Sequence, residues 1–259
     1  MYSFDVVIFD LDGVVTKTAL VHSAAWKKVI DGYLKEREKK YQEPFEEFTR
    51  TNDYLSYVDG KPRYKGVASF LESRGIDIPF GDPKDPPGKE TVCGLGNMKN
   101  RAFNQILKEN GAEVYASTVA FIHALKNAGI RIGVASSSKN CAAVLEATGL
   151  LDLFETRVDG VVSAELNLQG KPEPDIFTTA CDNLGGTNDR TVIVEDAVSG
   201  VQAGAKGNFG LVLGIARERN ERELKLNGAD IVVTDIQEID IDRIERWFQK
   251  RGSEEKQCN

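Results

Sequence analysis

The amino-acid sequence predicts an α/β protein, in which a mostly parallel sheet is covered by helices on both faces and interrupted after its first strand by a helical insert. The chain opens with Phe4 to Asp10, a β-branched and aromatic run typical of a buried strand. Residues 19–110 then hold charged, helix-forming stretches and no convincing strand. After Gly111, strand-like and helix-like segments alternate, which is the pattern of a parallel sheet.

The first strand is expected to end in a sharp loop, because Gly13 follows it closely. The strand therefore brings Asp10 to the carboxyl edge of the sheet. Within the insert, residues 78–89 include four prolines and two glycines, which exclude a regular helix or strand. The helices predicted in the insert are Trp26 to Tyr41, Pro44 to Thr51, Tyr64 to Ser73 and Asn97 to Lys108.

The second half of the chain carries the remaining strands of the predicted sheet, separated by helical stretches. This alternation sets the domain boundaries: residues 1–15 and 111–259 should form the core, and residues 16–110 a helical cap. The predicted strands are Ile130 to Ala135, Thr191 to Val194, Phe209 to Ile215 and Asp230 to Val233.

The composition indicates a soluble globular protein and excludes several function classes. The chain has 259 residues, 41% of them hydrophobic, and its longest apolar stretches are far shorter than the ~20 residues of a membrane-spanning helix. A net charge of -7 argues against general binding of nucleic acid. The first residues lack the basic flank of a signal peptide, so we expect a cytoplasmic protein with no membrane partner. The four cysteines, Cys258 among them, have the spacing of free thiols.

Polar residues gather where predicted strands end. Asp10 to Gly13 follows the first strand, Ser136 to Ser138 the second, and Glu195-Asp196 the third, while Lys171 lies in a loop after Gly170. Ligands of such sheets bind beyond the carboxyl ends of the strands. We therefore expect these four groups to line one site.

The residue types at these strand ends suit phosphoryl transfer. Asp10, Glu195 and Asp196 make an oxygen-rich cluster, and oxygen ligands are those that Mg²⁺ prefers. Lys171 adds a fixed positive charge for a phosphoryl group. Ser136, just before a predicted helix, offers a hydroxyl and helix N–H groups to phosphate oxygens. This set predicts attack by a carboxylate nucleophile, with metal and lysine neutralising the charge.

Four segments, DLDGV, ASSSKN, GKPEPDIF and VIVEDAVSG, follow one another in this order along the chain. In sequence and spacing they resemble the signature motifs of the haloacid dehalogenase superfamily, which implies a Rossmann-like α/β core with an inserted helical cap domain. The resemblance implies that Asp10 is the nucleophile that becomes an aspartyl phosphate and that Asp12 is the general acid/base. Ser136 and Lys171 would bind the transferring phosphoryl group. The ligands implied for Mg²⁺ are Asp10, Asp12 through its backbone carbonyl, Glu195 and Asp196.

Residues of the insert are similar to those of the β-phosphoglucomutase-like subfamily. His22 and Trp26 are four residues apart on one predicted helix face, and a glycine turn precedes Arg63 in VDGKPR. The resemblance implies that a helical cap closes on a sugar phosphate and that Arg63 binds the phosphate that is not transferred. The substrate-binding residues implied in this way are Thr18, His22, Trp26, Gly60, Arg63, Lys99, Ser138 and Asn140.

The resemblance therefore implies an isomerase that interconverts β-D-glucose 1-phosphate and glucose 6-phosphate, with a small-molecule sugar phosphate as its partner. Two alternatives stay open: a sugar-phosphate phosphatase with the same nucleophile, and a catalytically silent sugar-phosphate binding module. Residues 78–90 lengthen the insert beyond the typical cap of the family, so the identity of the sugar stays open as well. The sequence does not predict an oligomeric state.

Overall fold

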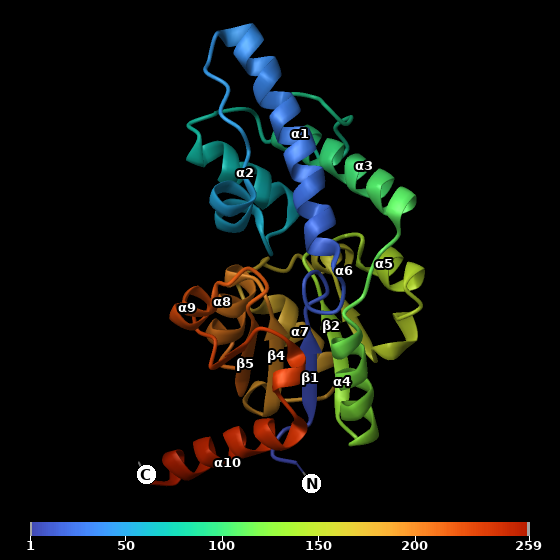
Figure 1. Cartoon of the computed structure of the whole chain (residues 1–259), viewed down its shortest axis with the longest axis vertical. Helices are drawn as coiled ribbons and strands as arrows, with labels where there is room; N and C mark the ends of the chain where they lie inside the picture. Colours follow the sequence, from blue (N-terminus) through green and yellow to red (C-terminus); the bar gives the residue numbers. More distant parts are fainter. Residues whose placement is uncertain (1, 258–259) are drawn as a thin grey trace. The chain divides into compact units, whose positions relative to one another are not determined.

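Six parallel strands form the sheet of this computed structural model, which describes residues 2–257 and, in the last helix, side chains as far as Ser253. The strand order is β3-β2-β1-β4-β5-β6, which is the Rossmann order (Figure 1). All residues of β1, β4 and β5 are buried. Because successive residues of a strand point to opposite faces, both faces of the sheet are covered. The strands are β1 (Val6–Phe9), β2 (Arg131–Ala135), β3 (Thr156–Val158), β4 (Thr191–Glu195), β5 (Leu211–Ile215) and β6 (Ile231–Val233).

The five predicted strands are confirmed, with bounds that shift by no more than about two residues. The sequence does not predict β3, because its three residues are too few to show an alternating pattern. The helices between and after the strands are α4 (Ala116–Asn127), α5 (Cys141–Ala147), α6 (Gly160–Glu165), α7 (Asp175–Asn183), α8 (Val198–Lys206), α9 (Glu221–Leu226) and α10 (Ile241–Gln257), with short 3-10 turns at η2 (Leu151–Leu153), η3 (Asn188–Arg190) and η4 (Ile236–Glu238).

The chain divides into two compact units. We call Met1–Lys17 with Glu113–Asn259 the sheet unit, and Thr18–Ala112 the helical unit. The helical unit has a hydrophobic core of its own, which includes Trp26, Phe48 and Phe70. Its elements are α1 (Thr18–Tyr41), η1 (Arg50–Val58), α2 (Arg63–Ser73) and α3 (Val92–Asn110). The assignment of residues 16–110 as a cap remains a prediction.

One helix predicted in the insert, over residues 44–51, is wrong. The chain there is irregular and leads into the π-helical stretch η1. Side chains take the backbone N–H groups that such a helix would use: Asp31 Oδ1 accepts from the N–H of Phe48 at 2.8 Å, and Asp53 Oδ2 accepts from that of Thr49 at 2.7 Å. Residues 78–89 contain no helix or strand, as predicted.

Two further findings concern the class of the protein. No helix among the described residues combines the length and the apolar character needed to cross a membrane. Cys93, Cys141 and Cys181 are free and buried, as their spacing predicts. Cys258 lies outside the described residues.

Candidate active site

The end of β1 places Asp10 beside the ends of both neighbouring strands. Phe9 pairs with Val134 of β2 and with Val194 of β4. The N–H of Asp10 donates to the carbonyl oxygen of Val194 at 2.9 Å. Strands in this register end at the same edge of the sheet, so the residues that follow them converge there. The direction of the strand order changes at this place, between β1 and β4. Asp10 is buried there, with 6% of its surface exposed.

Lys171 lies at the centre of the charged groups at this edge. Its Nζ donates to Asp10 Oδ1 at 2.5 Å and to Glu195 Oε1, and Lys171 and Glu195 are buried. Burial alone would lower the pKa of Lys171, but attraction by Asp10 and Glu195 outweighs it, so the pKa is raised. The ammonium group therefore stays charged and balances two carboxylates.

Three carboxylates of this edge could hold a metal ion. One oxygen each from Asp10, Glu195 and Asp196 lies within 4.8 Å of the others. Burial raises the pKa of Asp10, Lys171 opposes this rise, and the negative charge of Glu195 adds to it. A hard divalent cation would relieve that crowding of negative charge, and carboxylate oxygens are its preferred ligands. The residues present therefore fit Mg²⁺.

Two glycines make room for these carboxylates. A β-carbon at Gly13 would overlap the carboxylate of Asp196, and one at Gly200 would overlap that of Glu195. Gly13 also has a φ of +96°, a backbone conformation that other residues rarely adopt. Glycines of two sequence motifs thus leave space for the acidic side chains.

The serine-rich loop after β2 folds back on itself. The N–H of Ser138 donates to Ser136 Oγ, and the N–H of Asn140 donates to Ser138 Oγ, each at 3.1 Å. Ser136 is buried, and its Oγ lies 3.4 Å from Asp12 Oδ2. The structure therefore brings the predicted acid/base Asp12 and the predicted phosphate-binding Ser136 together. The side chain of Asp12 lies outside the three-carboxylate cluster, which leaves the backbone carbonyl as its predicted metal ligand.

In the helical unit, three predicted residues form one group. Lys99 is buried, its Nζ contacts His22 Nδ1, and it lies 5.1 Å from the ring centroid of Trp26. An ammonium group only donates, so Nδ1 of His22 is the acceptor in this contact. Phe103 completes the group, stacked on His22 with centroids 4.1 Å apart and 5.0 Å from Lys99 Nζ. The sequence analysis missed Phe103, although its position four residues after Lys99 on α3 was the signal.

Arg63 and Gly60 belong to a second group of the helical unit. Gly60, with a φ of +69°, forms the turn before α2, and Arg63 is the first residue of that helix. Arg63 Nη2 donates to Asn100 Oδ1 at 2.7 Å, and burial lowers the pKa of Arg63. Asn100 directly follows Lys99, so both groups include a residue of the same turn of α3. Thr18, the first residue of α1, is buried one helical turn before His22.

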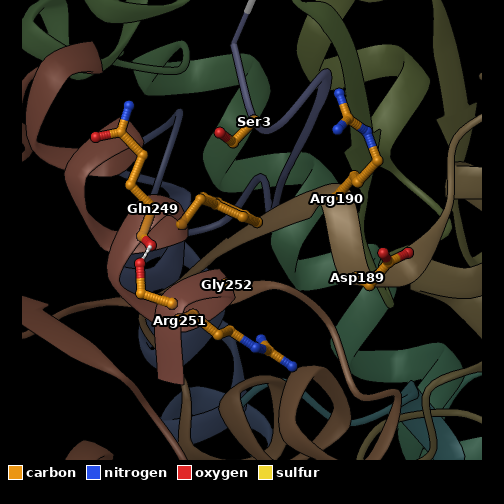
Figure 2. Close-up of a pocket in the computed structure, with 8 residues that line it drawn as sticks. Ser3, Asp189, Arg190, Gln249, Arg251 and Gly252 are labelled. Atoms are coloured by element: carbon orange, nitrogen blue, oxygen red, sulfur yellow. Dashed lines mark hydrogen bonds between the residues drawn. The ribbon is translucent and has the colours of Figure 1, made fainter. Parts of the chain in front are cut away.

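A separate hollow of about 500 Å³ lies at the opposite, amino-terminal edge of the sheet (Figure 2). Residues before β1 and β4 line it together with α10. Its arginines have protein partners: Arg190 Nε donates to Asp5 Oδ2 at 3.3 Å, and Arg251 Nη1 donates to the carbonyl of Gly210 at 2.8 Å. This hollow is therefore apart from the strand ends that carry the sequence motifs.

Comparison with known proteins gives consistent matches. The sequence model of the haloacid dehalogenase-like hydrolase family matches residues 4–208. β-Phosphoglucomutase of Mycobacterium tuberculosis (strain CDC 1551 / Oshkosh) is 47% identical over 235 residues, which cover 90% of this chain and 90% of the relative. β-Phosphoglucomutase of Bacillus subtilis (strain 168) is 30% identical over 248 residues, 95% of this chain and 96% of the relative.

A solved structure resembles the whole chain. The crystal structure of β-phosphoglucomutase from Clostridium difficile superposes with a TM-score of 0.72, covering 96% of this chain and 98% of its own. The two sequences are 24% identical, so this match shows a common fold.

Proposed function

The chain belongs to the haloacid dehalogenase-like hydrolase family, and we propose that it is a magnesium-dependent phosphotransferase that interconverts β-D-glucose 1-phosphate and glucose 6-phosphate. The observation that carries the proposal is the buried carboxylate of Asp10, held by Lys171 beside Glu195 and Asp196 at the edge of the sheet. The relative at 47% identity supports this choice of reaction. A cytoplasmic location belongs to the same proposal.

In the proposed reaction, a carboxylate oxygen of Asp10 attacks phosphorus and the sugar oxygen leaves. Lys171 holds this carboxylate and places its charge beside the phosphoryl oxygens, where negative charge is concentrated during transfer. The hydroxyl of Ser136 donates a hydrogen bond to another of these oxygens. Asp12, 3.4 Å from Ser136, gives a proton to the leaving sugar oxygen and takes one from the attacking hydroxyl in the return step.

Mg²⁺ would neutralise part of the charge on the carboxylates and the phosphoryl group. The side chains of Asp10, Glu195 and Asp196, with the backbone carbonyl of Asp12, would hold it. Glu195 is well fixed for this role, because its Oε2 accepts from the N–H groups of Asp196 and Ala197, each at 2.9 Å.

The two half-reactions balance without a further reactant. Phosphorylated Asp10 transfers its phosphoryl group to the 6-hydroxyl of β-glucose 1-phosphate, and the proton of that hydroxyl goes to Asp12. The resulting 1,6-bisphosphate turns over, returns its 1-phosphoryl group to Asp10 and leaves as glucose 6-phosphate, its 1-oxygen protonated by Asp12. A sugar with two phosphates requires a second cationic site in addition to the catalytic one.

We propose that the helical unit is the cap that supplies this second site. Arg63 would bind the phosphate that is not transferred, and Lys99, His22 and Trp26 would bind the sugar phosphate beside it. The partly buried guanidinium of Arg63 supports this role, since a planar fork of donors matches phosphate oxygens. The remaining substrate-binding residues of the proposal are Thr18, Gly60, Ser138 and Asn140.

One assay tests the proposed function. The protein is incubated with β-glucose 1-phosphate, Mg²⁺ and a trace of glucose 1,6-bisphosphate, and glucose 6-phosphate and free phosphate are both measured. We expect glucose 6-phosphate without stoichiometric phosphate. Asp10→Asn should lower the rate by roughly 10⁴-fold or more, as loss of a nucleophile does. Wild-type activity of this variant would falsify the assigned mechanism.

The family description as hydrolase favours a second candidate, a sugar-phosphate phosphatase with the same nucleophile. In that case water attacks the aspartyl phosphate, and the assay gives phosphate in proportion to the sugar phosphate consumed. A catalytically silent binding module would yield neither product while it still binds the sugar phosphate. The two products therefore separate the three functions.

A further inference from the structure

The proline-rich segment, residues 78–90, lies in the helical unit next to Tyr64, the neighbour of Arg63. We propose that this segment is a positioning element that acts through Asn97 and Tyr64, holds the guanidinium of Arg63 in place, and so favours substrates with a second phosphate. This inference rests on the proposed function, because it assigns the distal phosphate to Arg63. It gives a role to the part of the insert that lengthens this chain beyond the typical cap.

The proline-rich segment is folded around one buried carboxylate. Asp85 is 8% exposed and accepts hydrogen bonds from Thr91 Oγ1 at 2.8 Å, Lys89 Nζ at 2.6 Å and the N–H of Asp82 at 3.1 Å. Thr91 in turn caps α3, since its Oγ1 accepts from the N–H of Gly94 at 2.9 Å. An irregular segment without its own core is thus fixed to the start of α3.

Asn97 connects this segment to α2. Its Nδ2 donates to the carbonyl oxygens of Pro83, at 3.0 Å, and Asp85, at 2.9 Å. Both carbonyls only accept, so the amide can face them with its nitrogen alone and must turn its oxygen the other way. Tyr64 Oη donates to that oxygen at 2.9 Å. The proline-rich segment therefore fixes the orientation of Asn97, and Asn97 fixes the ring of Tyr64.

Tyr64 and Arg63 pack closely against α3. A β-carbon at Gly96 would lie 2.8 Å from the ring of Tyr64 and 3.2 Å from Cγ of Arg63. These approaches are tighter than ordinary van der Waals contacts, so the glycine lets both side chains lie against the helix. Phe80 of the proline-rich segment meets the ring of Tyr64 edge-on, with centroids 6.3 Å apart. The segment thus holds Tyr64 indirectly through Asn97 and directly through a ring contact.

The surroundings of Arg63 explain why it needs such support. Burial lowers its pKa, and Asn100, its hydrogen-bond partner, is neutral. Within the part of the chain that the structure describes, no carboxylate lies within ion-pair distance of Arg63. A partly exposed cation that donates to a neutral amide is suited to bind an anionic ligand. Holding it in one rotamer beforehand lowers the entropy that phosphate binding must overcome.

Asn97→Ala and Tyr64→Phe test this inference in the full-length protein with Mg²⁺. We expect the KM for β-glucose 1-phosphate to rise about 10-fold in Asn97→Ala, and about 3-fold in Tyr64→Phe, which keeps the ring and loses the hydroxyl. In the proposed reaction β-glucose 1-phosphate places its own phosphate at Arg63 while phosphorylated Asp10 reacts, whereas the one phosphate of p-nitrophenyl phosphate is transferred to Asp10. Turnover of p-nitrophenyl phosphate should therefore stay within about 2-fold of wild type. Lys89→Met is the matched control: it removes a partner of Asp85 but no contact of Asn97, and both activities should stay within about 2-fold.

A second readout does not depend on the reaction. In ¹⁵N NMR spectra of the metal-loaded protein, the Nε–H signal of Arg63, assigned through its loss in Arg63→Lys, should be sharp and protected from exchange in wild type. It should broaden or exchange rapidly in Asn97→Ala and stay unchanged in Lys89→Met. If wild type makes no glucose 6-phosphate, the proposed function fails. If the Arg63 signal is the same in wild type and Asn97→Ala, or if both substrates lose turnover equally, the positioning role is wrong.

Discussion

The sheet unit and the helical unit hold their predicted site residues in different ways. In the sheet unit opposite charges meet, since Lys171 contacts the carboxylates of Asp10 and Glu195 at the ends of strands in fixed register. Among the predicted site residues of the helical unit, Lys99 lies on aromatic rings and against an imidazole, and Arg63 donates to an amide. The sheet unit thus carries its own charge balance, whereas Arg63 gains a counter-charge only when an anion binds.

The predicted sites of the two units therefore depend on different interactions. When a carboxylate is buried beside an ammonium group, removal of either partner destabilises the folded protein, because the other charge stays behind unpaired. Arg63 donates to the neutral amide of Asn100, so a change near it should alter binding more than folding. Mutations in the two units should therefore separate stability from recognition.

The largest effect is expected for Lys171→Met in the sheet unit. The variant leaves Asp10 and Glu195 as buried like charges, so the free energy of unfolding in the presence of a chelator should fall by about 3–5 kcal/mol. Turnover should fall by about 10²- to 10³-fold, because a fixed charge at the phosphoryl group is lost. Urea unfolding and steady-state rates measure the two quantities.

The double variant Lys171→Met with Glu195→Gln is the control for this prediction. It removes one of the two unpaired charges, so a part of the lost stability should return while turnover remains low. Recovery of turnover together with stability would mean that Lys171 only stabilises the fold. The charge balance of the sheet unit would then be structural and not catalytic.

Two glycine-to-alanine variants, one in each unit, should show smaller effects. Alanine in place of glycine within a helix usually adds about 0.5–1 kcal/mol of stability. Gly32→Ala in α1 should show this gain with unchanged activity, since no atom lies within 4 Å of the new methyl group. Gly200→Ala in α8 should instead lose about 1–3 kcal/mol, because the methyl group overlaps the carboxylate of Glu195.

Magnesium titration of the rate checks the consequence for the candidate metal site. Gly200→Ala should need a higher Mg²⁺ concentration for half-maximal rate, and Gly32→Ala the same concentration as wild type. Equal behaviour of the two variants would show that the space beside Glu195 has no functional importance. Intrinsic fluorescence during urea unfolding measures the stability of both.

The two units also differ in how far their sites follow from the sequence. The residues at the strand ends of the sheet unit could be placed from the sequence, because strand register and short motifs fix the backbone and the backbone fixes Asp10 and Glu195. The need for glycine at positions 13 and 200 could not be predicted from the sequence, because it depends on where a carboxylate lies after folding. The three-residue strand β3 was too short to show its pattern.

In the helical unit, sequence reasoning placed residues by resemblance and helical spacing alone. It predicted His22 and Trp26, which the structure places together with Lys99. It did not predict Asn97, whose proposed role depends on carbonyl groups of an irregular segment. It also predicted a helix over residues 44–51, where the side chains of Asp31 and Asp53 take backbone N–H groups. Contacts between side chain and irregular backbone leave no periodic signal in the sequence.

The smallest expected effect concerns acid stability and compares one carboxylate from each unit. Asp53 of the helical unit accepts from the N–H of Thr49 at 2.7 Å and pairs with Arg74 at 2.8 Å. Burial alone would raise its pKa, but these partners outweigh it and lower the pKa below the ordinary 3.8. Glu245 of the sheet unit accepts from the N–H and hydroxyl of Ser3, and its pKa is lowered as well.

A depressed folded pKa means that the stabilisation is complete above the unfolded pKa and is lost as the pH falls through the folded value. Asp53→Asn should therefore lower the free energy of unfolding by about 1–2 kcal/mol at pH 7, and the difference from wild type should shrink below about pH 4. Glu245→Gln should follow the same course with a smaller difference, because Ser3 provides no charge. A difference that stays constant down to pH 3 would point to lost packing instead of lost ionisation.

Two tryptophans allow these effects to be assigned to the units. Trp26 lies in the helical unit and Trp247 in the sheet unit, and the chain has no others. In a Trp247→Phe background the fluorescence reports the helical unit, and in a Trp26→Phe background it reports the sheet unit. Asp53→Asn should shift the first transition more than the second. Equal shifts of both would show that the two units unfold as one, so that the charge arrangement of one unit governs the stability of the other.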